Sequence, residues 1–274
     1  LLLCDRALVC KGEPQQTLPP YTQSRAMTAG WCWQIPLAHH TGLGYVYSSE
    51  FISDDEAMAE ISDRFNLSGT TTTPRQLKMK IGRRTNTWVK NCVAIGLAAG
   101  FVEPLESTGI HLIQTAIEDL MDFFPDQSMN PVLQRNYNER VRQQFDEVRD
   151  FLLVHYLYSN REDLPFWQAS STVSEPQSLT DRLALYRECG TVDSNSGIAF
   201  NETSYHHLLN GCGIYPRRQH SAANMIPIEE IKQLLKDIQQ RHNRSTEFLL
   251  YLQKLRDCRT LSIDDIITKK DREV

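Results

Sequence analysis

The feature that most constrains the fold of this chain is a change in the spacing of its apolar residues. The stretch GWCWQIP at residues 30–36 alternates large apolar side chains with small or polar ones and ends on proline. This period of two predicts a β-strand. From Ser107 onward, apolar residues recur every three or four positions instead, which predicts helices. We therefore expect an α/β protein in which several strands are followed by a mainly helical part.

Local signals predict further elements ahead of this change. A turn before the apolar residues 45–47 favours a hairpin with the strand at 30–36. Ser53 and Glu56 have the spacing of a capping box, so a helix should start there. Two more apolar runs are expected to form strands: residues 1–9 and the nearly continuous run 92–102.

The helical part begins with a helix that follows Ser107. Its apolar residues predict a stripe facing the core: Ile110, Ile113, Ile117, Leu120 and Phe124. Proline, glycine and the same spacing predict a long helix from near Pro131, a helix over 178–189 ended by Gly190, a helix over 201–210 ended by Gly211, and one or two more within 227–258. No internal repeat or low-complexity linker interrupts the chain, so we expect one continuous unit with a strand-rich region, 1–106, and a helical region, 107–274.

Composition excludes several classes of function. The net charge of −5 and the pI of about 5.9 argue against a nucleic-acid partner. No apolar run reaches the roughly 18 residues of a membrane span, so no membrane contact is expected. The seven cysteines are scattered without a CxxC pair, which argues against a zinc site or any other metal site and suits reduced thiols in the cytoplasm.

The stretch GFVEPLESTGI at residues 100–110 places carboxylates and hydroxyls between an apolar run and a helix start. The first amides of a helix lack intrahelical partners and carry a partial positive charge, so they bind anions readily. Gly109 has no side chain to bar an approaching anion, and Thr108 adds a hydroxyl or an amide. The alternative is ordinary capping, in which Ser107 or Thr108 caps the helix and the glutamates complement its dipole.

Three stretches in the same order resemble the flavin-dependent tryptophan halogenases. GWCWQIP fits the G-W-x-W-x-I-P signature of that family. GRRTNTWVKNCVAIGLAAGFVEPLESTGIHLIQ and FNETSYHHLLNGCGIYPRR are also similar to it. The resemblance extends from about Leu2 to Pro227 and implies an FAD-dependent monooxygenase-like fold.

The family's G-x-G-x-x-G motif and its halogen-delivering lysine are not found in this sequence. We therefore expect the chain to be the C-terminal portion of a halogenase, without the N-terminal dinucleotide-binding part and inactive by itself. An exposed sheet edge would then be a liability for aggregation.

The resemblance implies a reaction in which reduced FAD, oxygen and chloride or bromide halogenate an indole or tryptophan-like aromatic. A separate flavin reductase would supply the reduced FAD as a transient partner. The oligomeric state stays open, with a homodimer among the alternatives.

The resemblance also implies roles for particular residues. Glu106 and Ser107 would be catalytic, and the backbone of Thr108 and Gly109 would bind the halide. Leu97 and Ile110 would contact the flavin. Trp31, Trp33 and Phe200 would line the path of the substrate, while Glu103 would be a structural acid satisfied by backbone donors.

The substrate region departs from the tryptophan-specific members. Asn195 takes the position of an acid and Ala199 that of an aromatic ring, so plain indole or another aromatic is as credible as free tryptophan. Phe200, Tyr205 and His206 are candidates for this region, with ordinary helix packing as their alternative. Two other functions remain open: a flavin-dependent aromatic hydroxylase and a non-catalytic helical interaction module.

Overall fold

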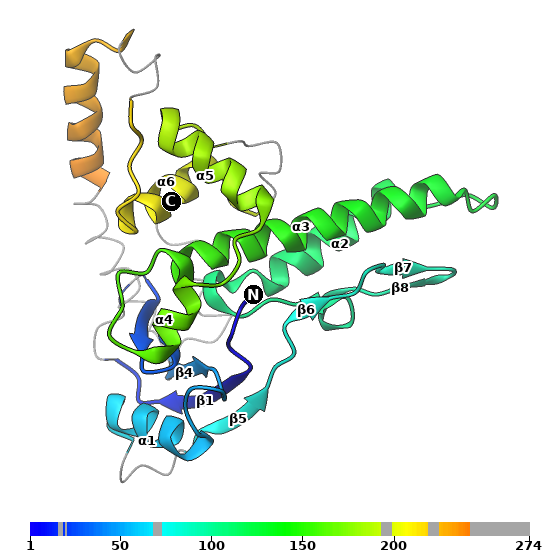
Figure 1. Cartoon of the computed structure of the whole chain (residues 1–274). Helices are drawn as coiled ribbons and strands as arrows, with labels where there is room; N and C mark the ends of the chain where they lie inside the picture. Colours follow the sequence, from blue (N-terminus) through cyan, green and yellow to red (C-terminus); the bar gives the residue numbers. More distant parts are fainter. Residues whose placement is uncertain (16–18, 20, 68–72, 193–198, 219–224, 242–274) are drawn as a thin grey trace, which may run out of the picture.

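The computed structural model describes residues 1–15, 19, 21–67, 73–192, 199–218 and 225–241, and it combines one main sheet with a set of helices (Figure 1). The sheet is antiparallel, with the strand order β2-β3-β4-β1-β5. Its strands are β1 (Arg6–Gly12), β2 (Gln23–Met27), β3 (Gly30–Pro36), β4 (Thr41–Tyr47) and β5 (Arg75–Lys78).

The predicted hairpin is confirmed by the pairing of β3 with β4. Trp31 lies opposite Val46 and Trp33 lies opposite Gly44. A Cβ atom on Gly44 would lie only 2.0 Å from the ring of Trp33. Glycine at this position therefore allows the indole of Trp33 to lie across the neighbouring strand.

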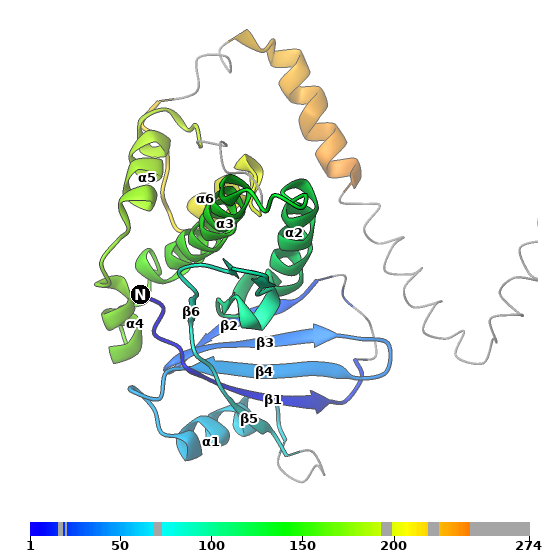
Figure 2. The same ribbon diagram turned by 90° about the vertical axis from the view of Figure 1, so that its right-hand side faces the viewer.

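The two faces of the sheet are covered by different helices (Figure 2). Helix α1 (Asp54–Arg64) covers one face with Ala57 and Ile61, and the predicted capping box of Ser53 and Glu56 is confirmed. The other face carries Trp31 and packs against Phe166 and Trp167 of α4 (Pro165–Ser171). Because alternate residues of β3 point to opposite faces, the tryptophan face is the one that meets the helical part.

The helical part is built around a long helix that runs away from the sheet (Figure 1). This helix is α3 (Pro131–Leu157), and the other helices are α2 (Gly109–Asp122), α5 (Gln177–Cys189) and α6 (Glu202–Gly211). Residues 228–241 form a further helix with mostly exposed side chains. The rest of the predicted C-terminal helical region lies outside the described residues.

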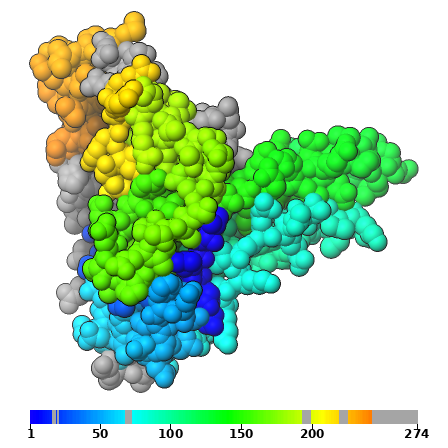
Figure 3. Space-filling view, in the orientation of Figure 1, coloured from blue at the N-terminus to red at the C-terminus, as the bar shows by residue number. Residues whose placement is uncertain are grey.

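The far end of α3 forms an arm together with a small hairpin (Figure 3). The hairpin pairs β7 (Trp88–Val89) with β8 (Cys92–Val93). Asn138 of α3 fixes it, because its Oδ1 accepts from the N–H of Thr87 at 2.8 Å and of Trp88 at 2.7 Å. The ring of Trp88 also packs edge-on against Tyr137.

The expectation of a continuous buried strand over residues 92–102 is wrong. Only β8 and β9 (Gly100–Phe101) are strands there, and a 3₁₀ turn, η1 (Gly96–Ala98), lies between them. Strand β9 pairs with β6 (Gly82–Arg83). Gly96 has a φ of +63°, a left-handed conformation that glycine adopts easily and that ends a strand. The run is apolar, but its small residues form a loop.

The expected core stripe of α2 is wrong at three of its five positions, since Ile110, Ile117 and Phe124 are 73%, 44% and 72% exposed. Leu120 packs against the core as expected. The helix instead buries the adjacent face, which includes polar residues: Leu112, Thr115, Ala116 and Asp119. Polar partners on α3 explain this choice, since the Asp119 carboxylate accepts hydrogen bonds from Arg140 at 2.9 Å and Gln144 at 2.6 Å.

The strand expected over residues 1–9 begins later, at Arg6. Leu2 and Leu3 pack against the buried clusters on the tryptophan side of the sheet instead. Asp5, the residue before β1, is held by Ser49: its carboxylate accepts hydrogen bonds from the N–H and the hydroxyl of Ser49 at 2.8 and 2.9 Å.

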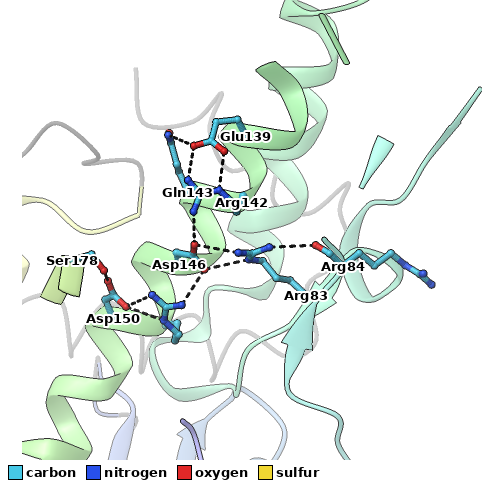
Figure 4. A network of polar contacts seen from close by, with 9 residues as sticks. Arg83, Arg84, Glu139, Arg142, Gln143, Asp146, Asp150 and Ser178 are labelled. Atoms are coloured by element: carbon cyan, nitrogen blue, oxygen red, sulfur yellow. Dashed lines mark hydrogen bonds and ion pairs between the residues drawn. The ribbon is translucent and has the colours of Figure 1, made fainter. Parts of the chain in front are cut away.

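A polar network on α3 ties β6 and α5 to the long helix (Figure 4). Arg83 of β6 donates two hydrogen bonds to Asp146, both at 3.2 Å. Asp150, one turn further, accepts from Arg149 at 2.9 and 2.6 Å and from the hydroxyl of Ser178. The side chain of Asp150 is only 2% exposed, so this carboxylate depends on protein donors.

Replacing Asp150 by Ala should lower the free energy of unfolding by about 1–3 kcal/mol, because the change removes a buried carboxylate and leaves the partly buried Arg149 without this acceptor. Urea unfolding followed by circular dichroism measures this loss. Glu139→Ala is the matched control, since Glu139 belongs to the same network but is 49% exposed, and it should change stability by less than about 1 kcal/mol. Equal losses in the two variants would contradict this assignment.

Candidate active site

The stretch that drew attention in the sequence forms a strained turn between β9 and α2. A short 3₁₀ helix, η2 (Leu105–Ser107), leads into α2. Glu106 has a φ of 69° and Ser107 a φ of 56°, so two successive residues with side chains are left-handed. Each such residue costs roughly 1–3 kcal/mol, and such strain collects at functional sites. The turn therefore sets the directions of these two side chains at a cost in backbone conformational energy.

A cavity of about 420 Å³ opens on one side of this turn, and we call it the aromatic cavity. Small-molecule sites have volumes of roughly 300–1,000 Å³. The cavity brings together four residues singled out in the sequence: Trp31, Trp33, Glu106 and Ser107. The two indole rings are tilted by 47° with centroids 5.7 Å apart. Their other neighbours there are Thr22, Ser24, Ile35, Pro104 and Leu105.

A second cavity of about 100 Å³, the small cavity, opens on the next residues of the same turn. It brings together Leu97, Thr108 and Gly109. A Cβ atom on Gly109 would meet nothing within 4 Å. Residues 104–107 thus line the aromatic cavity, and residues 108–109 line the small one. Consecutive residues of one turn therefore line both spaces.

The start of α2 is not capped by a side chain. Thr108 occupies the N-cap position, but its hydroxyl makes no capping hydrogen bond. The first turn of α2 contains no acidic residue. The capping alternative is therefore right about the N-cap position of Thr108 but not about a capping side chain, and the first amides of α2 still lack a side-chain partner. Such amides suit an anion.

The other predicted residues are less closely associated with the two cavities. Ile110 is 73% exposed and points outward from α2, and Leu97 is 81% exposed although it borders the small cavity. Phe200 is buried and stacks on Phe151 with ring centroids 3.7 Å apart. Tyr205 packs edge-on against the same ring. For Phe200 and Tyr205 the structure thus gives helix packing, while Asn195 lies outside the described residues.

His155 is a neighbour of Glu106 that sequence reasoning missed. Its Nε2 lies 3.1 Å from Oε1 of Glu106. It sits in the last turn of α3, far from Glu106 along the chain. The one histidine within the otherwise apolar and aromatic stretch FLLVHYL was the signal that could have drawn attention to it. The site therefore contains a carboxylate and an imidazole in direct contact.

Glu103 lies behind the aromatic cavity and is only 1% exposed. The expected backbone donors are absent from its contacts in the described chain. The hydroxyl of Tyr156 donates to its Oε1 instead. Burial raises the pKa of Glu103 to about 7, although the Tyr156 hydroxyl and the Trp31 indole oppose this shift. Glu103 is therefore buried, and its partners are side chains rather than the expected backbone donors.

The raised pKa of Glu103 predicts a pH dependence of stability. Between pH 4.5, the ordinary value, and about 7, the folded state holds a proton that the unfolded state has released. Stability should therefore fall as pH rises through this window. Between about pH 5 and pH 8, the protein should lose roughly 2–3 kcal/mol relative to Glu103→Gln, whose amide does not titrate. Urea unfolding of both proteins at the two pH values measures this, and parallel pH profiles would contradict it.

Within the ranges that the structure describes, no three His, Cys, Asp or Glu side chains are grouped so that they could hold a metal ion. Nor does any helix in those ranges have the length and apolar character that a bilayer crossing requires.

The fold and the turn define an α/β protein with an aromatic cavity beside an uncapped helix start. The sequence matches the family described as tryptophan halogenase over residues 1–227, and this chain belongs to that family. Among curated relatives, the tryptophan 6-halogenase ThaL of Streptomyces albogriseolus is 36% identical over 267 residues, which is 90% of this chain and 50% of ThaL.

Solved structures agree with this assignment. Xcc4156, a flavin-dependent halogenase from Xanthomonas campestris, has a TM-score of 0.79 at 37% identity and is matched by 91% of this chain over 50% of its own length. The tryptophan 6-halogenase SttH from Streptomyces toxytricini has a TM-score of 0.82 at 32% identity, with 93% and 52% covered. The chain thus spans about half the length of the relatives that it matches.

Proposed function

We propose that this chain supplies the substrate side and the halide side of a flavin-dependent halogenase. The reaction would use reduced FAD, oxygen and chloride or bromide to halogenate an indole or tryptophan-like aromatic. One observation carries this proposal: a single strained turn lines a cavity with two tryptophans on one side and a small cavity at an uncapped helix start on the other. The named activities of ThaL and SttH support it.

The residues present fit one wall of a flavin site. The small cavity of about 100 Å³ is too small for a flavin ring system. Leu97 nevertheless exposes an apolar side chain at the border of this cavity, and Ile110 exposes another in the first turn of α2. Apolar side chains of this kind suit the face of a planar ring. We propose that the surrounding fold is FAD-dependent monooxygenase-like. When bound, reduced FAD and oxygen supply the oxidant that converts halide into an electrophilic halogen.

We propose that the main chain at the start of α2 holds the halide. The N–H groups of Thr108 and Gly109 lie where an anion gains from the helix dipole. Gly109 keeps the approach open, because no atom lies within 4 Å of where a side chain would begin.

On the other side of the turn, Trp31 and Trp33 would stack against the aromatic substrate, exclude water and keep the substrate away from the flavin side. The electrophilic halogen forms a bond to a ring carbon, and the proton on that carbon must then leave. The carboxylate of Glu106, which lines the aromatic cavity, is placed to accept it. Ser107 adjoins Glu106 in the same cavity and would help to orient it.

The product of the whole gene tests this proposal. It is incubated with FAD, a flavin reductase, NADH and bromide, with indole or tryptophan as the substrate. We expect a product in which bromine replaces one hydrogen, identified by mass spectrometry, that depends on every component. A product that gains oxygen whether or not bromide is present would favour the aromatic hydroxylase instead. Bound flavin without brominated product would contradict the proposal.

A further inference from the structure

His155 joins the turn to the helical part through two contacts on opposite sides of its ring. Its Nε2 lies 3.1 Å from Oε1 of Glu106, and its Nδ1 lies 3.3 Å from the carbonyl oxygen of Phe151. The ring also packs edge-on against the ring of Phe151, with centroids 5.6 Å apart. The imidazole is therefore fixed in position and in rotation.

These two contacts determine where protons must lie. A carbonyl oxygen only accepts hydrogen bonds, so Nδ1 must carry a proton. In a neutral imidazole the other nitrogen, Nε2, would then present a lone pair. A lone pair facing a carboxylate oxygen at 3.1 Å is repulsive. A proton must lie between Nε2 and Oε1, and since histidine is the stronger base of the two groups, it belongs on Nε2.

We propose that His155 is a positioning residue for Glu106: an imidazolium that holds one carboxylate oxygen and leaves the other free for the substrate. The kinetic part of this inference rests on the proposed function. In the described part of the chain, Oε1 is the oxygen of Glu106 that has a partner, and that partner is His155. The charge-assisted bond fixes a carboxylate that the left-handed turn already aims at the aromatic cavity.

The other charged groups around His155 agree with an imidazolium. Glu103 lies close enough to His155 for the histidine's charge to lower the pKa of Glu103. It approaches from the stretch after β9, whereas Glu106 approaches from η2. Tyr156, the next residue on α3, directs its hydroxyl to Glu103. His155 thus faces two carboxyl groups, and the side chain is 25% exposed, so a proton can exchange with water.

Nuclear magnetic resonance of this chain with ¹⁵N-labelled histidine tests the proton placement without any halogenation assay. In the unchanged chain, we expect the His155 signals to show protons on both ring nitrogens. In Glu106→Gln, the Nε2 proton should be lost and the Nδ1 proton kept. His155→Gln assigns the signals. An Nε2 without a proton in the unchanged chain, or ring signals unaffected by Glu106→Gln, would overturn the proposal.

Kinetics of the whole gene product test the positioning role. His155→Leu should lower kcat for halogenation about tenfold and change KM for the aromatic substrate by less than about twofold. His155→Gln keeps a donor for Glu106 and should recover most of the loss. His207→Gln, an exposed histidine on α6, is the control and should change nothing. A packing role alone predicts that Leu is tolerated at least as well as Gln, and that order would overturn the proposal.

The magnetic resonance and kinetic experiments together distinguish a failure of this inference from a failure of the proposed function. If the complete protein forms no halogenated product, the kinetic comparison fails for every variant alike. The ring-nitrogen signals of His155 would still decide whether the Glu106–His155 bond exists. If halogenation occurs but His155→Leu is fully active, the positioning role is wrong and the proposed function stands.

Discussion

Replacing Glu106 by Gln should lower the rate of halogenation by about 100- to 1,000-fold while the protein stays folded. The amide keeps the size of the side chain but cannot accept the ring proton, and a positioned base contributes about 10²–10⁴ to a rate. The side chain of Glu106 is 37% exposed and belongs to none of the buried apolar clusters. The rate is measured by mass spectrometry of brominated product under saturating substrate.

Glu118→Gln is the matched control for this variant. Glu118 is an exposed glutamate on α2, a short distance along the chain from the turn. It should leave both the rate and the thermal midpoint unchanged. Comparable turnover in Glu106→Gln and in the control would remove Glu106 from the mechanism.

Replacing Gly109 by Val should abolish halogenation, by about 100-fold or more, without destabilising the fold. A Cβ at this position meets nothing within 4 Å, and valine has no lower helix propensity than glycine. The change in the free energy of unfolding should therefore stay below about 1 kcal/mol. The valine methyl groups would instead occupy the space where an anion would approach the amides of α2. Product formation and urea unfolding are measured on the same preparation.

Two further variants make this result specific. Gly109→Ala adds a single methyl group and should retain more activity than Gly109→Val. Gly211→Val makes the same change at the end of α6, where a Cβ also meets nothing within 4 Å, and should be fully active. Full activity of Gly109→Val at several bromide concentrations would contradict halide binding at this turn.

Elements set by local sequence were predictable. The alternation around Trp31 and Trp33 predicted β3, and the spacing of Ser53 and Glu56 predicted the start of α1. In each case the signal lies within a few residues of the element, so no knowledge of distant partners is needed. The Gly190 that ends α5 belongs to the same group, because its φ of 73° is the conformation a helix end requires.

Features that depend on distant partners were not predictable from the local pattern. The buried face of α2 is set by Arg140 and Gln144 of α3, which satisfy Asp119 and allow a polar residue inside. The spacing of apolar residues alone predicted a buried face that includes Ile110 and Ile117, which are exposed. In the run 92–102, apolar character suggested a strand, whereas the left-handed conformation of Gly96 accompanies a 3₁₀ turn that interrupts it.

The same division holds for the candidate site. The helix start that follows Ser107 could be predicted, because its signals are adjacent in sequence. The absence of a capping side chain could not, since the same residues also favour ordinary capping. The left-handed backbone at Glu106 and Ser107 could not, since no local rule favours it for residues with side chains. His155 and the acid–phenol pair of Glu103 and Tyr156 were missed because α3 brings them back from a distant part of the chain.

The central claim is that the main chain at the start of α2 binds a halide on the opposite side of the turn from Glu106. Anomalous diffraction from crystals of this chain soaked in bromide tests it most directly. The account predicts a bromide peak in contact with the N–H groups of Thr108 and Gly109, and its loss in Gly109→Val. Bromide bound elsewhere on the surface, with no peak at this helix start in the unchanged protein, would contradict the account.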